Sequence, residues 1–282
     1  CIRDSARPVL ELLQTPPEIL DAAHSYIIII FWGIGAAMLF NLLSNVIRAL
    51  GDSRTPLYFL VLACVLNIAL DLALILRFGM GPAGAAVATV VSQLVSGLLC
   101  TIYVFRKFPM LRLTRADWNM SRRYLWAHIR LALPMGFQAS IIAIGAILVQ
   151  FALNRLGAQA VAAFSAAQKI DMVATLPMMS FGIAMATYVA QNYGARNPLR
   201  IRQGVLQCSL MSVGFSIAVA VVNIIWGPEL IRLFVGTGER EVVRLAQIYL
   251  NINASMYWVL ALLFVFRYTL QGLGQSVVPT FA

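Results

Sequence analysis

The sequence predicts an all-α protein that crosses a membrane several times. Of its 282 residues, 61% are hydrophobic and only 11% are charged, and the mean hydropathy is +0.83. Several apolar runs reach the roughly 20 residues that a helix needs to cross a hydrocarbon layer of ~30 Å. Because lipid offers no partner to the backbone of an open strand, these runs should all be helical. The composition excludes an ordinary soluble domain, and there are too many runs for a signal peptide.

Seven apolar runs are long enough to span. They cover residues 26–47, 56–76, 82–104, 131–153, 158–190, 205–226 and 247–270, and an eighth begins at Val277 and stops at Ala282. The segment before the first run begins with Cys1 and has neither the basic region nor the apolar core of a leader. We therefore expect further helices to precede it.

Basic residues gather in alternate gaps between the runs. The gaps 48–56, 105–130 and 193–202 carry two, seven and three Lys or Arg, against Asp52 and Asp117. Bases and acids balance in the other gaps. The positive-inside rule therefore places these three gaps in the cytoplasm. This distribution accounts for the net charge of +10 without a nucleic-acid partner, and the four cysteines show no disulfide or metal spacing.

Two parts of the chain repeat one another at a constant offset of 223 residues. Residues 22–56 align without gaps to residues 245–279, and the endings RALGDSRTP and QGLGQSVVP keep Gly, Ser and Pro in register. Both copies run from the predicted outside to the inside, so the repeat is parallel, as in some secondary transporters. It predicts two pseudo-symmetric six-helix lobes. If the run 131–153 opens the second lobe, the visible runs are helices 4 to 10 of twelve, followed by the start of helix 11.

A carboxylate, Asp71, lies inside the run 56–76. A charge at the centre of a spanning helix costs about 2.5–3.5 kcal/mol, and such residues usually face an interior or a cavity. Asn67 lies one turn earlier on the same face, and the hydroxyl of Thr89 in the next run is at a depth to reach it. These oxygen ligands suit a proton or a small cation. We predict an ion-coupling site of Asn67, Asp71 and Thr89, the alternative being an Asp held by hydrogen bonds for packing.

Four segments resemble the multidrug and toxic compound extrusion (MATE) family in order and spacing. They are RALGDSRTPLYFLVLACVLNIALD at 48–71, GMGPAGAAVATVVSQ at 79–93, LALPMGFQASI at 131–141 and QNYGARNPLRIRQG at 191–204. The resemblance implies two six-helix lobes around a central cavity, and export of drugs or metabolites in exchange for protons or sodium ions. In the branch similar to the DNA-damage-inducible (DinF-like) proteins, an Asn and an Asp of helix 5 and a Thr of helix 6 form the ion site with an Asp of helix 1. Asn67, Asp71 and Thr89 match the first three by spacing.

Three residues of the predicted second lobe are candidates for a substrate cavity: Gln138, Lys169 and Met178. Gln138 serves helix packing in the alternative interpretation, and Met178 belongs either to an adaptable drug surface or to plain core or lipid contact. Lys169 and Asp171 are two positions apart and should point to different sides of their helix. If that helix starts late, both lie near the interface instead.

The chain is predicted to contain the remainder of an N-terminal lobe at 1–104 (helices 4–6), a basic cytoplasmic inter-lobe loop at 105–130, and part of a C-terminal lobe at 131–282. The predicted function is secondary active multidrug or metabolite export by alternating access, in a bacterial inner membrane, by a monomer. Expected substrates are small, organic, and cationic or amphipathic. No cofactor is predicted beyond the coupling ion, a proton or sodium.

Two other classes of function compete with export. A flippase for lipid-linked oligosaccharides would have a similar architecture, but it would need several cationic groups for a pyrophosphate, and Lys169 is the only good candidate. An intramembrane prenyl-transferring enzyme would need Asp-rich metal-binding motifs, which the sequence lacks. We therefore do not predict an enzyme, and we keep the flippase as the alternative.

Overall fold

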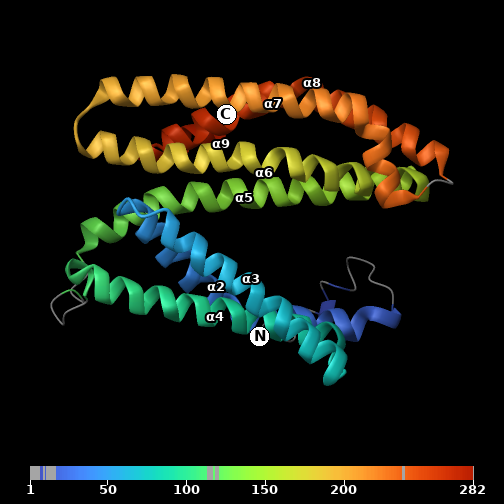
Figure 1. Ribbon diagram of the computed structural model, residues 1–282, viewed down its shortest axis with the longest axis horizontal. Helices are drawn as coiled ribbons and strands as arrows, with labels where there is room; N and C mark the ends of the chain where they lie inside the picture. The colour runs from blue at the N-terminus through green and yellow to red at the C-terminus, as the bar shows by residue number, and fades with distance from the viewer. Residues whose placement is uncertain are drawn as a thin grey trace. The chain divides into compact units, whose positions relative to one another are not determined.

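The computed structural model describes residues 7–8, 10, 17–112, 117, 121–236 and 239–281. In this part of the chain 92% of the structure is helical and there are no strands. The elements shown in Figure 1 are α2 (Pro17–Ala49), α3 (Arg54–Leu72), η1 (Ala73–Arg77), α4 (Gly81–Lys107), η2 (Pro109–Leu111), α5 (Arg122–Arg155), α6 (Ala158–Gly194), α7 (Pro198–Val235), α8 (Arg240–Gly272) and α9 (Val277–Phe281).

Seven of these helices are long and apolar enough to cross a membrane, so the predicted fold class is confirmed. Most of the helices extend beyond the apolar runs, because polar and basic residues continue a helix that hydropathy alone does not reveal. The clearest case is the predicted loop 105–130, where residues 122–130 already belong to α5. The hydroxyl of Ser121 caps this helix by accepting a hydrogen bond from the N–H of Arg123.

The chain divides into two compact units, and the first is Cys1–Asn119. In this unit α4 packs along both α2 and α3. Its core holds Phe40, Ile47, Cys100 and Val104. The helices α2 and α4 come close together at Gly97, where an added Cβ would lie 3.2 Å from the side chain of Leu39. Small residues at such crossings let helices in lipid gain close packing.

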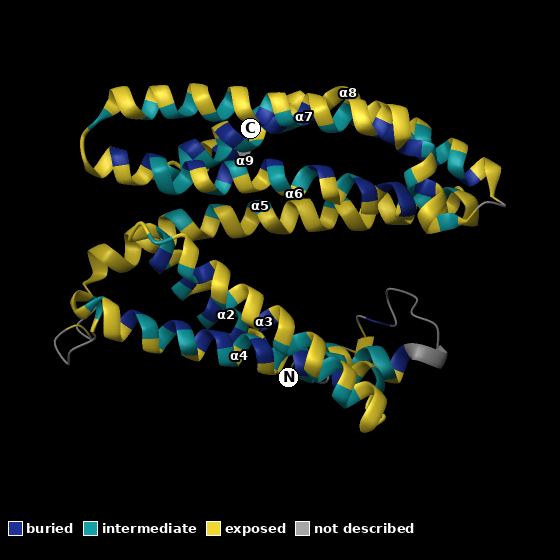
Figure 2. Cartoon of the chain, viewed as in Figure 1, coloured by how far each residue is buried: buried dark blue, intermediate teal, exposed yellow. Residues whose placement is uncertain are grey.

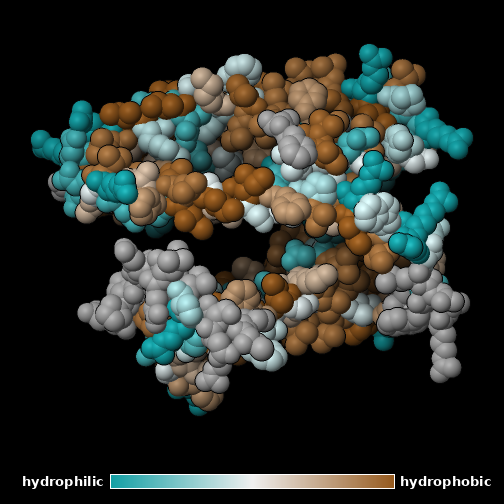
Figure 3. All heavy atoms as spheres, turned by 180° about the vertical axis from the view of Figure 1, so that it is seen from behind, coloured by the Kyte–Doolittle hydropathy of each residue, from teal (hydrophilic) through white to brown (hydrophobic). Residues whose placement is uncertain are grey.

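The second unit is Met120–Ala282, and its core lies where α8 packs against α6 and α7. Figure 2 shows buried residues along these three helices, whereas α5 has none. Hydrophobic side chains cover much of the length of this unit in Figure 3, and hydrophilic ones gather mainly at its two ends. An apolar belt between polar ends is the pattern expected of a bundle that spans a bilayer.

The repeat seen in the sequence is also present in the backbone. Both α2 and α8, and then α3 and α9, begin at positions 223 residues apart (17 and 240, 54 and 277). The N–H of Asp52 donates to Ile47 O at 3.2 Å, and the equivalent N–H of Gln275 donates to Leu270 O at 2.9 Å. Gly51 (φ 91°) and Gly274 (φ 78°) close the two turns. Their left-handed backbone is easily adopted by Gly and commonly ends a helix.

The carboxylate of Asp52 ties the first of these turns to the end of α4. The N–H of Thr55 donates to its Oδ1 at 3.1 Å, and the hydroxyl of Thr55 donates to its Oδ2 at 2.7 Å. The hydroxyl of Tyr103 also donates to Oδ2 at 2.7 Å, and Lys107 Nζ lies 3.5 Å away. These hydrogen bonds hold the pKa of Asp52 well below its usual range, and the bond from the Thr55 hydroxyl contributes most.

We predict that Asp52→Asn lowers the melting temperature of the protein in detergent at neutral pH. A lowered pKa means that the carboxylate stabilises the folded state above the pKa of the unfolded chain, and that this contribution is lost as the pH falls further. The difference in melting temperature between wild type and Asp52→Asn should therefore become smaller below about pH 4, near the ordinary pKa of Asp. Glu229→Gln, at an exposed acid of α7, is the control. A difference in melting temperature that stays constant with pH would contradict the assignment.

Candidate functional site

The predicted ion-coupling residues come from α3 and α4 of the first unit. Asp71 lies one residue before the end of α3, and Asn67 lies one turn earlier on the same helix. The chain then continues as the π-helix η1, in which the N–H of Phe78 bonds Ala73 O at 3.3 Å. Single π-turns of this kind occur frequently at functional sites. Asn67, Asp71 and Thr89 are all partly buried.

Thr89 on α4 meets Asn67 across the helix pair. The amide Nδ2 of Asn67 donates to Thr89 Oγ1 at 3.5 Å, which is long for a hydrogen bond. The Thr89 hydroxyl donates in turn to Ala85 O at 2.9 Å. The structure therefore brings two of the three predicted residues together, with the Thr89 hydroxyl proton directed back to its own helix.

The carboxylate of Asp71 is partly buried but incompletely hydrogen-bonded in the described part of the chain. Its Oδ1 is buried and has no hydrogen-bond partner among the described residues. No hydrogen bond joins Asp71 to Asn67 or Thr89 in that part of the chain. A buried acceptor without a partner costs about 1–3 kcal/mol, and more when it is charged. A hydrogen-bond donor or a cation beside this oxygen would supply the missing partner.

Gln138 lies where α9 packs on α5. Its Nε2 donates to Pro279 O at 2.6 Å, while its Oε1 is buried without a partner among the described residues. Nearby, Pro134 has no N–H to give to Arg130 O, and the hydroxyl of Ser276 donates to that carbonyl instead, at 3.3 Å. These contacts fit the packing interpretation of Gln138, and its contact with substrate stays a prediction.

Met178 lies in the core of the second unit with none of its surface exposed. It packs against Ala174 of its own helix and Ala254, Tyr257 and Ala261 of α8. The side chain is therefore closed to a substrate in this conformation, so the structure gives no support to a role for it in an adaptable drug surface.

Lys169 and Asp171 make contacts in different directions. Because α6 begins at Ala158, the alternative of a late helix start does not hold, and Lys169 lies about three turns after the start of the helix. The Nζ of Lys169 stands 5.4 Å from the ring centroid of Phe234 on α7. Asp171 Oδ1 accepts a hydrogen bond of 2.6 Å from the hydroxyl of Tyr257 on α8.

The hydrogen-bonded group around Asp171 was not predicted from the sequence. Besides donating to Asp171, the Tyr257 hydroxyl accepts a bond of 3.2 Å from Asn223 Nδ2 of α7. Three helices of the second unit are thus joined inside their packed core. Asp171, Asn223 and Tyr257 are each one of several polar residues in three separate apolar runs, and nothing in their spacing shows that the three meet.

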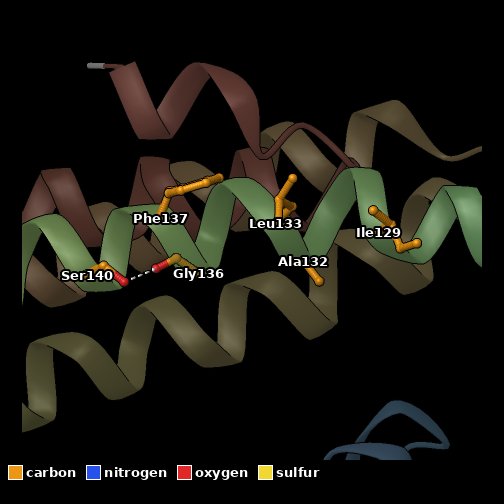
Figure 4. Close-up of a pocket in the computed structure, with 6 residues that line it drawn as sticks. All are labelled: Ile129, Ala132, Leu133, Gly136, Phe137 and Ser140. Carbon is orange, nitrogen blue, oxygen red and sulfur yellow. Dashed lines mark hydrogen bonds between the residues drawn. The ribbon is translucent and has the colours of Figure 1, made fainter.

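A pocket of about 410 Å³ lies on the open face of α5. Figure 4 shows its lining, which consists of Ile129, Ala132, Leu133, Gly136, Phe137 and Ser140. The one hydroxyl among them already donates to Gly136 O at 3.0 Å. The pocket therefore offers an apolar surface with little polar selectivity.

Seven helices long and apolar enough to cross a membrane define a polytopic membrane protein. The chain belongs to the MATE family: the family model MatE matches residues 5–73 and 134–282. The predicted family is thereby confirmed, and the protein is a multi-pass protein of the bacterial plasma membrane. Asn67 and Asp71 lie within the matched residues, and Thr89 lies between the two matched segments.

The similar proteins are longer than this chain. It is 34% identical over 273 residues to "Probable multidrug resistance protein YpnP" of Bacillus subtilis (strain 168), covering 95% of the chain and 60% of that protein. It is 28% identical over 275 residues to "FAD transporter" of Shewanella oneidensis, covering 94% of the chain and 59% of that protein. An outward-facing multidrug resistance MATE transporter superposes with a TM-score of 0.92 at 21% identity, covering 99% of the chain and 62% of that structure. The chain spans about 60% of the length of the curated relatives it matches.

Proposed function

We propose that the protein is a secondary active exporter of small organic compounds. The inward flow of protons or sodium ions drives the export. The observation that carries this proposal is the buried, unpaired Oδ1 of Asp71 inside a spanning helix. The name of the Bacillus relative, a probable multidrug resistance protein, supports export of drugs, and that of the Shewanella relative, an FAD transporter, supports export of metabolites. The DinF-like branch remains our prediction.

In this proposal Asp71 takes up the coupling ion while Asn67 and Thr89 supply further oxygen ligands. The π-helix η1 follows Asp71 directly, and a change between π- and α-helical hydrogen bonding there would alter how the end of α3 packs on α4. Coupling requires the ion and the exported compound to favour different states, because a ligand with equal affinity for both shifts nothing. Ion uptake in an outward-open state would lower the affinity for the compound and release it outside.

The proposed lobe assignment follows the sequence prediction. The helices α2, α3 and α4 are helices 4 to 6 of an N-terminal lobe, and α5 to α8 are helices 7 to 10 of a C-terminal lobe, with α9 opening helix 11. The basic segment before α5 is the cytoplasmic connection. A flippase is less well supported, because Lys169 is the one charged residue among the described lining residues of the pocket between α6 and α7, and a pyrophosphate would need several cationic groups.

Transport by the whole protein in proteoliposomes tests the proposal. A fluorescent organic cation is trapped with the protein, and a proton gradient and a sodium gradient are imposed separately. We expect export with one of the two gradients and its loss when an ionophore collapses that gradient. If the rate at which the compound moves depends on neither gradient, secondary active export is overturned. If the protein moves a labelled lipid-linked sugar instead, the flippase is favoured.

A further inference from the structure

A groove of about 560 Å³ lies between α6 and α7 in the second unit, within the usual size range of ligand sites. Lys169, Val173 and Pro177 line it on α6, and Phe215, Val222 and Phe234 line it on α7. We call it the α6–α7 groove. Its walls are apolar, and Lys169 is the one charged residue among its described lining residues.

Each of the two helices that line the groove contains a proline. Pro228 lies inside α7, and Figure 1 shows the last part of this helix bent away from the direction of the rest. The bent part packs back on α6 through Ile231, which is fully buried with Ala167 and Ile170. Pro177 stands inside α6 at the far end of the groove, where it cannot donate a hydrogen bond to Val173 O.

The charge at the mouth of the groove lies at the membrane boundary. Glu229 and Arg232 are exposed on the part of α7 that follows Pro228, so this part belongs outside the hydrocarbon layer. The Nζ of Lys169 stands over Phe234 of the same part, at 5.4 Å from the ring centroid. The apolar stem of Lys169 thus carries its ammonium group toward water, while Pro177 lies about 12 Å deeper along α6.

The ammonium group of Lys169 is available to a ligand. It takes part in no ion pair in the described part of the chain, and Asp171 is turned to Tyr257 on α8. The other polar lining residue, Asn223, uses its amide nitrogen on Tyr257. On the apolar side, Val173 is 73% exposed and Leu233 is 79% exposed, so the groove opens sideways rather than into the packed core.

We propose that the α6–α7 groove binds an anionic phospholipid, with the phosphate on Lys169 and an acyl chain along Val173, Pro177 and Phe215. A cation at the boundary above an apolar channel matches a negative head group above its acyl chain, by charge and by polarity. The site goes beyond the proposed export function, because its ligand comes from the bilayer and needs no gradient.

Native mass spectrometry of the whole protein, released from micelles containing equal phosphatidylglycerol and phosphatidylcholine, tests the site. We expect wild type to retain phosphatidylglycerol preferentially. Because one basic side chain near a membrane surface contributes about 1 kcal/mol, Lys169→Ala should reduce this retention about fivefold, and Lys169→Arg should keep it. Arg232→Ala removes a neighbouring charge that does not line the groove, and it should change little.

A matched pair of bulky substitutions tests the apolar part. Val222 lines the groove and Val221 does not, although they are 42% and 46% exposed. Val222→Trp should lower the retention of both lipids, and Val221→Trp should leave it unchanged. Equal retention of the two lipids by wild type, or equal losses in Lys169→Ala and Arg232→Ala, would overturn the proposal. Because no transport is measured, these outcomes are independent of the proposed function.

Discussion

Asp71→Asn is expected to reduce gradient-driven export by the whole protein at least tenfold. Asparagine keeps the size of the side chain but can neither take up a proton nor offer a negative charge to a cation. A carboxylate at the centre of a span costs about 2.5–3.5 kcal/mol. Uptake of a proton or binding of a cation would account for its presence in this helix. The measurement is the initial rate of efflux from proteoliposomes under the gradient that drives wild type.

The matched control for this substitution is Asp21→Asn, because the side chain of Asp21 is 89% exposed on α2. It should leave the efflux rate unchanged. Asn67→Ala and Thr89→Val each remove one neutral ligand, so their effects should be smaller than that of Asp71→Asn. Size-exclusion chromatography of each variant separates a coupling defect from misfolding. Wild-type rates in Asp71→Asn would show that the acid serves packing, which is the alternative interpretation of its place in α3.

Gly272→Ala is expected to destabilise the second unit by about 1–3 kcal/mol, the usual cost of overpacking. An added Cβ would lie 2.6 Å from Ala186 O of α6. This oxygen is part of the helix backbone, so it cannot move away as the end of a flexible side chain could. The two helices must therefore separate where α8 ends. In the first unit the equivalent position of the repeat is Ala49, so the glycine is required by the approach of α6 and α8 rather than by the turn.

The control for the second prediction is Gly145→Ala on α5. An added Cβ there meets no atom within 4 Å, and alanine is the better helix former by up to about 1 kcal/mol. This variant should melt at the wild-type temperature or slightly above it. Both melting temperatures are measured in the same detergent. If Gly272→Ala were as stable as Gly145→Ala, the close contact of α6 with α8 would not exist in solution.

The membrane-crossing fold could be predicted from the sequence because apolar length decides it. Each predicted run lies inside one candidate span, with the run 56–76 covering both α3 and η1, and α9 begins at Val277, where the eighth run was predicted to begin. The helix ends could not be predicted in the same way. The stretch RRYLWAHIR at 122–130 is too basic to register as a span, yet it is the first part of α5, because a helix continues beyond the lipid once its apolar part has formed.

The candidate site could be predicted only in part. The spacing of Asn67 and Asp71 places them on one face, and the contact with Thr89 follows from a short turn between neighbouring helices. The group formed by Asp171, Asn223 and Tyr257 comes from three helices that are far apart in sequence, and no local pattern encodes that meeting. The α6–α7 groove likewise depends on the bend after Pro228. The groove forms only when the bent part of α7 packs back on α6, and no local pattern in the sequence shows this contact.

The two turns of the repeat share a backbone but differ in what holds them. Asp52 closes the first turn with a carboxylate, and the equivalent residue of the second is the neutral Gln275. The second turn is instead held to α5 by the hydroxyl of Ser276, which does not titrate. Acid below about pH 4, near the ordinary pKa of Asp, would therefore weaken the first turn and leave the second intact. The two copies of one element thus differ in chemistry, because one depends on an ionised carboxylate and the other on a hydroxyl that stays neutral.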